Sequence, residues 1–211
     1  EQSNAANCNE SLIMELYAAA LAFSDKPELI KKYALHVYEA QLQSKKQNGP
    51  KLTPEEIKKI TFDKGGVSIP LYRCAFDGDI TNAEYELLYT LGSVGNLEND
   101  IFDFYKDCLQ GIQTMVTTET DIANLQNEYH FMISSIFRQI EQTQYSAAHK
   151  RRFRYFVTLV VGRGLVGLAQ LMRLSRKTGG TFLPEKYSRN ELICDMEQPL
   201  NVLRLLHHAA I

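Results

Sequence analysis

Apolar residues recur at intervals of three and four along almost the whole chain, and the strict alternation typical of a half-buried strand is scarce. We therefore predict an all-α protein. Two helices are expected first, over residues 9–24 and from Pro27 to Leu42, because Pro27 suits the first turn of a helix. The stretch from Ser44 to Leu52, rich in Lys, Asn, Gly and Pro, is the clearest loop.

Two further helix starts are marked by a Thr followed three residues later by a Glu, at Thr53 and Glu56 and again at Thr81 and Glu84. This spacing is that of a capping box, in which a hydroxyl and a carboxylate satisfy backbone N–H groups at the helix start. We expect a short helix after Thr53 and a long one after Thr81. Helices over residues 119–143, 145–177 and 189–208 complete the set.

Length and composition favour one globular unit. With 211 residues and 45% hydrophobic content, the chain can bury one sizeable core, so we treat residues 1–211 as a single all-helical domain. A net charge of −2 and a pI of about 6.3 argue against nucleic acid as a partner. The four cysteines are widely spaced and no signal peptide follows Glu1, so a cytoplasmic location is predicted.

The most apolar stretch runs from Tyr155 to Met172 and has an arginine, Arg163, near its middle. A membrane span tolerates such a charge badly. We therefore predict a core helix and no membrane span, with Arg163 facing a polar cavity or paired with an acid. On the long helix, Gly92 and Gly95 each lower helix propensity by up to about 1 kcal/mol, which indicates close approach of a neighbouring helix or a ligand.

The most informative residues form a row of oxygen donors on that long helix. Asn99, Asp103 and Asp107 recur every four residues and share one helix face, with Asp100 beside them. Apolar flanks indicate partial burial, where repulsion between acids is strong unless a cation offsets it. Oxygen ligands without His or Cys favour Mg²⁺ or Mn²⁺. The alternative is a solvated acidic stripe balanced by Lys106.

Together with its surroundings, this row resembles the class I isoprenoid synthase family, which includes trans-prenyl diphosphate synthases and terpene cyclases. Those proteins carry a lysine motif, a D-G turn, a glycine-containing helix that ends in an acidic motif, and a G-K-x-T-like segment. The 4 + 4 spacing also resembles the Asn, Ser/Thr, Glu metal triad of terpene cyclases. The corresponding residues here are Lys64-Gly65-Gly66, Asp77-Gly78-Asp79, Gly92 to Asp103, then Asp107, Gly111 and Thr114.

The resemblance implies a helical bundle around a central apolar cavity, with Mg²⁺ at its mouth and a prenyl diphosphate as substrate. Lys64 would bind the diphosphate, and Arg73 is a weaker candidate for the same task. The implied metal ligands are Asn99, Asp103 and Asp107, with Asp100 as an alternate ligand. Cyclisation is favoured slightly over chain elongation because Asn leads the acidic row and no second arginine motif is evident. A homodimer is possible, as dimers are common in the family.

One element of the family is missing, namely the upstream aspartate-rich motif that holds two of the metals. Nothing before Lys64 resembles it. Either the helix that carries it precedes Glu1 in the full polypeptide, so that this chain lacks N-terminal helices of the family, or the metal cluster is incomplete. In the second case the protein would be a non-catalytic ligand-binding or interaction module. Separately, the basic run at residues 150–154 is either a phosphate-binding patch or a solvated first turn.

Overall fold

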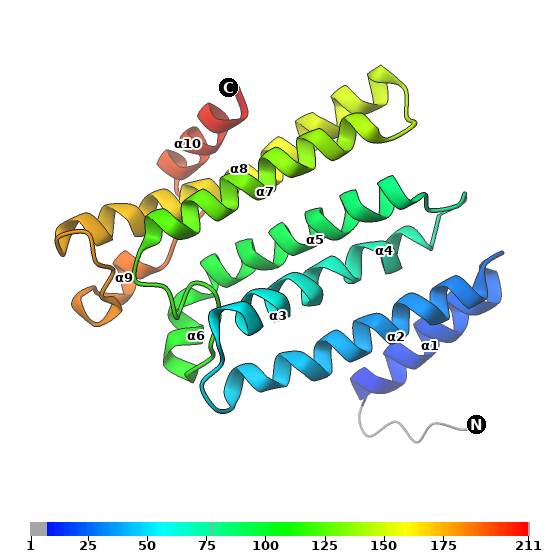
Figure 1. The fold of residues 1–211 in the computed structure, drawn as a ribbon, viewed down its shortest axis with the longest axis horizontal. Helices are drawn as coiled ribbons and strands as arrows, with labels where there is room; N and C mark the ends of the chain where they lie inside the picture. Colours follow the sequence, from blue (N-terminus) through cyan, green and yellow to red (C-terminus); the bar gives the residue numbers. More distant parts are fainter. Residues whose placement is uncertain (1–7, 77, 211) are drawn as a thin grey trace.

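The computed structural model describes residues 8–76 and 78–210, without the side chains of residues 8, 9 and 208–210. Within these residues every regular element is a helix, which confirms the all-α prediction (Figure 1). The elements are α1 (Cys8–Phe23), α2 (Pro27–Ser44), the 3₁₀ turn η1 (Lys45–Asn48), α3 (Pro54–Gly66), α4 (Ser68–Arg73), α5 (Asn82–Phe102), α6 (Phe104–Gln110), α7 (Ile122–Gln142), α8 (Ala147–Lys177), η2 (Pro184–Lys186), α9 (Arg189–Leu192) and α10 (Pro199–Ala210).

Helix α5 lies at the centre of the arrangement and contacts α3 and α4 on one side and the α7–α8 pair on the other. The α1–α2 hairpin extends this array beyond α3, and α10 packs on α8 (Figure 1). The main hydrophobic core lies between α5, α7 and α8, where Leu97, Tyr129 and Leu168 are fully buried. A second, smaller cluster around Ile30 and Tyr33 joins α2 to α4.

One of the two predicted capping boxes forms completely. The Thr53 side chain accepts a hydrogen bond from the Glu56 backbone, and the Glu56 carboxylate accepts one from the Thr53 backbone. At α5 only half of the motif forms, because Thr81 accepts from the Glu84 backbone while the Glu84 carboxylate binds other partners. Pro27 begins α2, as predicted.

Two predicted helices are interrupted. The expected helix over residues 189–208 is wrong: α9 ends at Leu192, because the backbone of Ile193 is extended, and α10 begins at Pro199, whose missing N–H is tolerated only in the first turn of a helix. The long helix that carries the acidic row ends at Phe102, and Asp103 joins it to α6. Asp77, in the predicted D-G turn, lies outside the described residues.

The predicted close approach at Gly92 is confirmed, and its partner is Gly65 on α3. A Cβ built on Gly65 would lie 2.1 Å from the Gly92 carbonyl oxygen, and one built on Gly92 would lie 2.3 Å from the Gly65 carbonyl oxygen. The two helix backbones are therefore in direct contact, which only glycine permits. A Cβ on Gly95 would instead meet nothing within 4 Å.

Helix α8 is long and apolar enough, by length and composition, to cross a membrane. Core helices of soluble proteins pass the same test, and 44% of its most apolar segment is buried inside the protein. The helix packs against α5, α7 and α10. Arg163, near its middle, pairs with an acid as predicted: its Nε lies 3.3 Å from Oε1 of Glu98 on α5.

Candidate functional site

The acidic row keeps its four-residue spacing through the junction between α5 and α6. The Asp103 backbone donates to the Asn99 carbonyl at 2.8 Å, and the Asp107 backbone donates to the Asp103 carbonyl at 2.9 Å. These bonds continue the helical path although the backbone of Asp103 departs from regular helix geometry. Asn99, Asp103 and Asp107 thus follow one side of a slightly broken helix.

Asp100 and Asp107 are both buried, which is unusual for carboxylates without a paired cation. Thr61 on α3 donates a hydrogen bond of 3.2 Å to Asp100 Oδ2. Burial, together with the neighbouring charges of Asp107 and Asp103, raises the pKa of Asp100 to about 7, although Lys64 and the hydrogen bond from Thr61 oppose the shift. Burial also raises the pKa of Asp107, as does the charge of Asp103.

Asp103 is more accessible and lies closer to solvent. The Asn99 side-chain amide donates to Asp103 Oδ2 at 3.3 Å. The Lys106 ammonium lies 3.6 Å from the same oxygen. The predicted ligands therefore divide into an accessible pair, Asn99 with Asp103, and a buried pair, Asp100 with Asp107.

The predicted diphosphate-binding lysine and the first residue of the acidic row line the same hollow, which has a volume of about 560 Å³. Lys64, in the last turn of α3, and Asn99 both line it. Gly92 and Gly95 of α5 line it as well, and Gly95 leaves room where a larger side chain would fill the space, because a Cβ there would meet nothing within 4 Å. Its apolar wall comes mainly from the first half of α8, with Phe153, Phe156, Val157 and Val160.

The oxygen donors of the acidic row can hold Mg²⁺ only if a bound ligand supplies further oxygen atoms. Among the described residues, no three His, Cys, Asp or Glu side chains gather closely enough to hold an ion. Mg²⁺ in proteins is commonly bound through one or two carboxylates together with substrate phosphates and water. The accessible Asp103 and the amide oxygen of Asn99 are suited to such a partial site, with the buried acids behind them.

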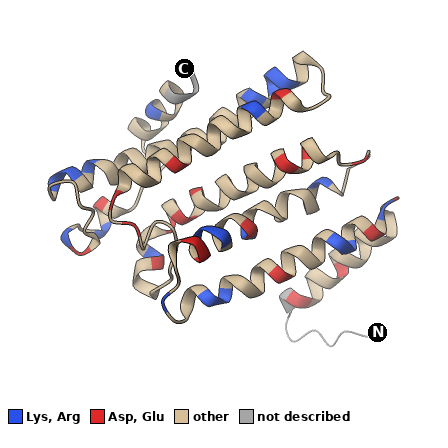
Figure 2. Ribbon diagram, in the orientation of Figure 1, with Lys and Arg blue, Asp and Glu red and all other residues tan. Residues whose placement is uncertain are grey.

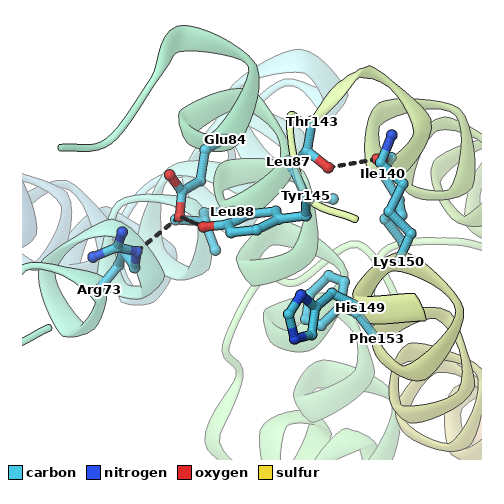
Figure 3. A pocket seen from close by; sticks show the side chains of 10 residues that line it. All are labelled: Arg73, Glu84, Leu87, Leu88, Ile140, Thr143, Tyr145, His149, Lys150 and Phe153. Carbon is cyan, nitrogen blue, oxygen red and sulfur yellow. Dashed lines mark hydrogen bonds and ion pairs between the residues drawn. The ribbon is translucent and has the colours of Figure 1, made fainter. Parts of the chain in front are cut away.

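Arg73, the weaker candidate for diphosphate binding, does not join this group. Its Nε lies 2.7 Å from Glu84 Oε1, and the Tyr145 hydroxyl donates to the same oxygen at 2.9 Å (Figure 3). Glu84 precedes Asn99 by about four turns of α5, roughly 22 Å along the helix axis. Arg73 therefore lines a different hollow, of about 430 Å³, which shares only Phe153 with the first.

Glu98 is a buried acid that the sequence analysis did not single out. Its Oε1 pairs with Arg163, whereas no described residue donates to its buried Oε2. Burial raises the pKa of Glu98 to about 7, although Arg163 opposes the shift. The guanidinium of Arg163 also lies over the Phe102 ring, 5.3 Å from its centroid.

The apolar wall of the first hollow was also missed. Phe153, Phe156 and Val160 are spaced three and four residues apart, which is the pattern of any buried helix face. Periodicity alone does not separate a cavity wall from a packed core, so this signal could not have identified them.

Comparison with known proteins adds no assignment, because no family model, curated protein or solved structure matches this chain.

Proposed function

We propose that this protein binds a prenyl diphosphate in the hollow lined by Lys64 and Asn99 and ionises it with the help of Mg²⁺, as terpene cyclases and prenyltransferases do. The all-helical fold would then be of the isoprenoid synthase type, with this hollow as its central cavity. The observation that carries the proposal is that a lysine, an amide at the head of an acidic row and an apolar wall meet in one hollow.

The chemistry of the substrate matches the two ends of the hollow. Its diphosphate is anionic and would lie against the Lys64 ammonium, while its hydrocarbon chain would lie along Phe153, Phe156 and Val160 of α8. Aromatic faces attract a neighbouring cation, so the two phenylalanines would stabilise the allylic carbocation. Apolar walls with a few placed polar groups are typical of small-molecule sites.

The proposed cation would be held by Asn99 and Asp103, with Asp107 and Asp100 behind them. Mg²⁺ would neutralise the diphosphate as the allylic C–O bond breaks. The buried acids support this proposal because burial and the charge of neighbouring acids raise the pKa of both, and a nearby divalent charge would oppose that effect.

One observation favours the second candidate function, a non-catalytic binding module. No acidic side chain among the described residues lines this hollow. A complete metal cluster needs carboxylates from a second helix, so the protein would then bind an amphiphilic ligand without converting it. Release of pyrophosphate distinguishes the two functions.

The test begins with thermal unfolding in the presence of Mg²⁺, inorganic pyrophosphate and a C15 prenyl diphosphate. The wild-type melting temperature should rise only when the metal and a diphosphate are both present, by ligand linkage. Asp103→Ala and Lys64→Met should lose this response. Glu86→Ala, an exposed acid on α5, and Lys59→Met, an exposed lysine on α3, are the matched controls and should keep it.

A wild-type protein that ignores Mg²⁺ and both diphosphates would refute the proposal, as would an Asp103→Ala variant that responds like wild type. If the response is present, pyrophosphate release from the C15 substrate is then measured. Release establishes the enzyme, and binding without release establishes the module.

A further inference from the structure

Helix α8 has a charge pattern that the proposed site does not use. Its 31 residues include eight Lys and Arg and no Asp or Glu, whereas the whole chain has a net charge of −2. Four of the basic residues lie within five positions at its start, the segment 150–154. Figure 2 shows these basic residues gathered beside the α7–α8 turn.

Two of these four basic residues bind Glu141, at the end of α7. Lys150 donates to the Glu141 carbonyl at 2.7 Å, and Arg154 pairs with the Glu141 carboxylate at 2.9 Å. Arg151 and Arg152 are exposed, and no described acid forms an ion pair with either. The turn therefore presents two arginines whose charges are not neutralised locally.

Exposed aromatic side chains follow these arginines on the same side of the helix. Tyr155 is four residues after Arg151, and Phe156 is four residues after Arg152, so each aromatic residue lies one turn from an arginine on a shared face. Tyr155 is 58% exposed and Phe156 is 57% exposed. Their rings contact each other edge to face, with centroids 6.1 Å apart. We call Arg151, Arg152, Tyr155, Phe156 and the exposed Val160 the basic-aromatic face.

We propose that the basic-aromatic face docks this protein on an anionic lipid surface. Helices that lie in the membrane interface combine Lys and Arg with Trp, Phe or Leu, and the basic residues are attracted to anionic headgroups. Here an acid-free helix on an otherwise acidic chain supplies the charge complementarity, and Phe156 and Val160 supply apolar surface. This proposal does not depend on the proposed function.

The position of the hollow favours lipid over nucleic acid as the occupant. Phe156 and Val160 belong both to the basic-aromatic face and to the wall of the hollow that contains Lys64. Apolar surface therefore continues from the docking face into the cavity. A membrane bound at this face would place acyl chains beside the opening, where an apolar ligand could pass between bilayer and protein.

The experiment is co-sedimentation of the full chain with vesicles of phosphatidylcholine, with or without phosphatidylglycerol. Binding should require the anionic lipid and should weaken when salt is raised from about 0.1 M to about 1 M, because screening shortens the Debye length from about 10 Å to about 3 Å. Replacing Arg151 and Arg152 together by Ala should lower binding about thirtyfold. The matched control replaces Arg173 and Arg176, at the far end of α8, and should bind like wild type.

A fluorescence measurement tests insertion separately from charge. The chain contains no Trp, so Phe156→Trp creates a single reporter on the basic-aromatic face. Its emission should shift to shorter wavelength when anionic vesicles are added. Leu109→Trp, at an exposed position on α6, is the control and should not shift.

Three results would overturn the proposal. The first is equal binding to both vesicle types, and the second is an equal loss of binding in the control double variant. The third is binding to duplex DNA without binding to anionic vesicles, which would identify a nucleic acid as the partner. Circular dichroism of each variant verifies that the helices remain intact.

Discussion

Replacing Asp100 with Asn should stabilise the metal-free protein, and the gain should depend on pH. In the folded state burial raises the pKa of this carboxyl from 3.8 to about 7. The folded protein therefore holds a proton there over a pH range in which the unfolded chain has lost it. By linkage, stability falls as pH rises through this range and stays low above the folded-state pKa.

The magnitude follows from the size of the shift. Each unit of pKa difference corresponds to about 1.36 kcal/mol, so a shift of about three units makes the ionised carboxylate unfavourable by about 4 kcal/mol at pH values above the folded-state pKa. Asn resembles the protonated acid in shape and can still accept the hydrogen bond from Thr61. The free energy of unfolding of the variant should therefore equal that of wild type below the unfolded-state pKa and exceed it above the folded-state pKa.

Urea unfolding with a chelator present measures this effect at about pH 5 and about pH 8. The difference between Asp100→Asn and wild type should grow by about 2–3 kcal/mol between the two conditions. Ser93→Ala is the control, because it removes a buried hydroxyl from the same helix without changing an ionisable group. An Asp100→Asn difference that stays constant with pH would refute the argument that burial raises the pKa of this carboxyl in the folded protein.

Three further predictions concern the glycines and the Glu98 ion pair. Gly92→Ala should destabilise the fold by about 1–3 kcal/mol through overpacking, whereas Gly95→Ala should stabilise it by up to about 1 kcal/mol. Thermal unfolding of both variants checks this contrast, and equal effects on the melting temperature would contradict it. Gly164→Ala should also destabilise, since its Cβ would lie 2.2 Å from a buried tyrosine hydroxyl, and unchanged urea midpoints would count against this packing. Arg163→Met removes the charge that lowers the pKa of Glu98, so it should destabilise more at about pH 8 than at about pH 5, with equal losses arguing against the pair.

Local signals in the sequence predicted most of the helices but could not identify their tertiary partners. The Thr53 capping box needs only residues within one turn, and it forms as predicted. The Thr81 motif has the same spacing, yet Glu84 binds Arg73 and Tyr145 instead, because a buried carboxylate gains more from a charged and a hydroxyl partner than from an exposed backbone N–H. That preference depends on how α4 and the α7–α8 turn pack.

The candidate site shows the same contrast between local signals and tertiary packing. Four-residue spacing predicted that Asn99, Asp103 and Asp107 share one side of the helix, and the backbone keeps that order. The depth of Asp100 follows from the packing of α3 against α5, which no local pattern encodes. An acid partner for Arg163 was one of two predicted options, but its identity as Glu98 required knowing which face of α5 meets α8. The metal and substrate assignments remain predictions.

The contact between Gly65 and Gly92 limits how closely α3 and α5 can approach each other. Lys64 is adjacent to Gly65, and Asn99 follows Gly92 by about two turns. Two backbones in contact cannot move closer and move apart only at the cost of buried packing, so the contact sets the spacing between the backbones that carry Lys64 and Asn99. A single methyl group at the crossing would widen that spacing while leaving every predicted ligand residue unchanged. The proposed function would then be lost without any change to the chemistry of the site.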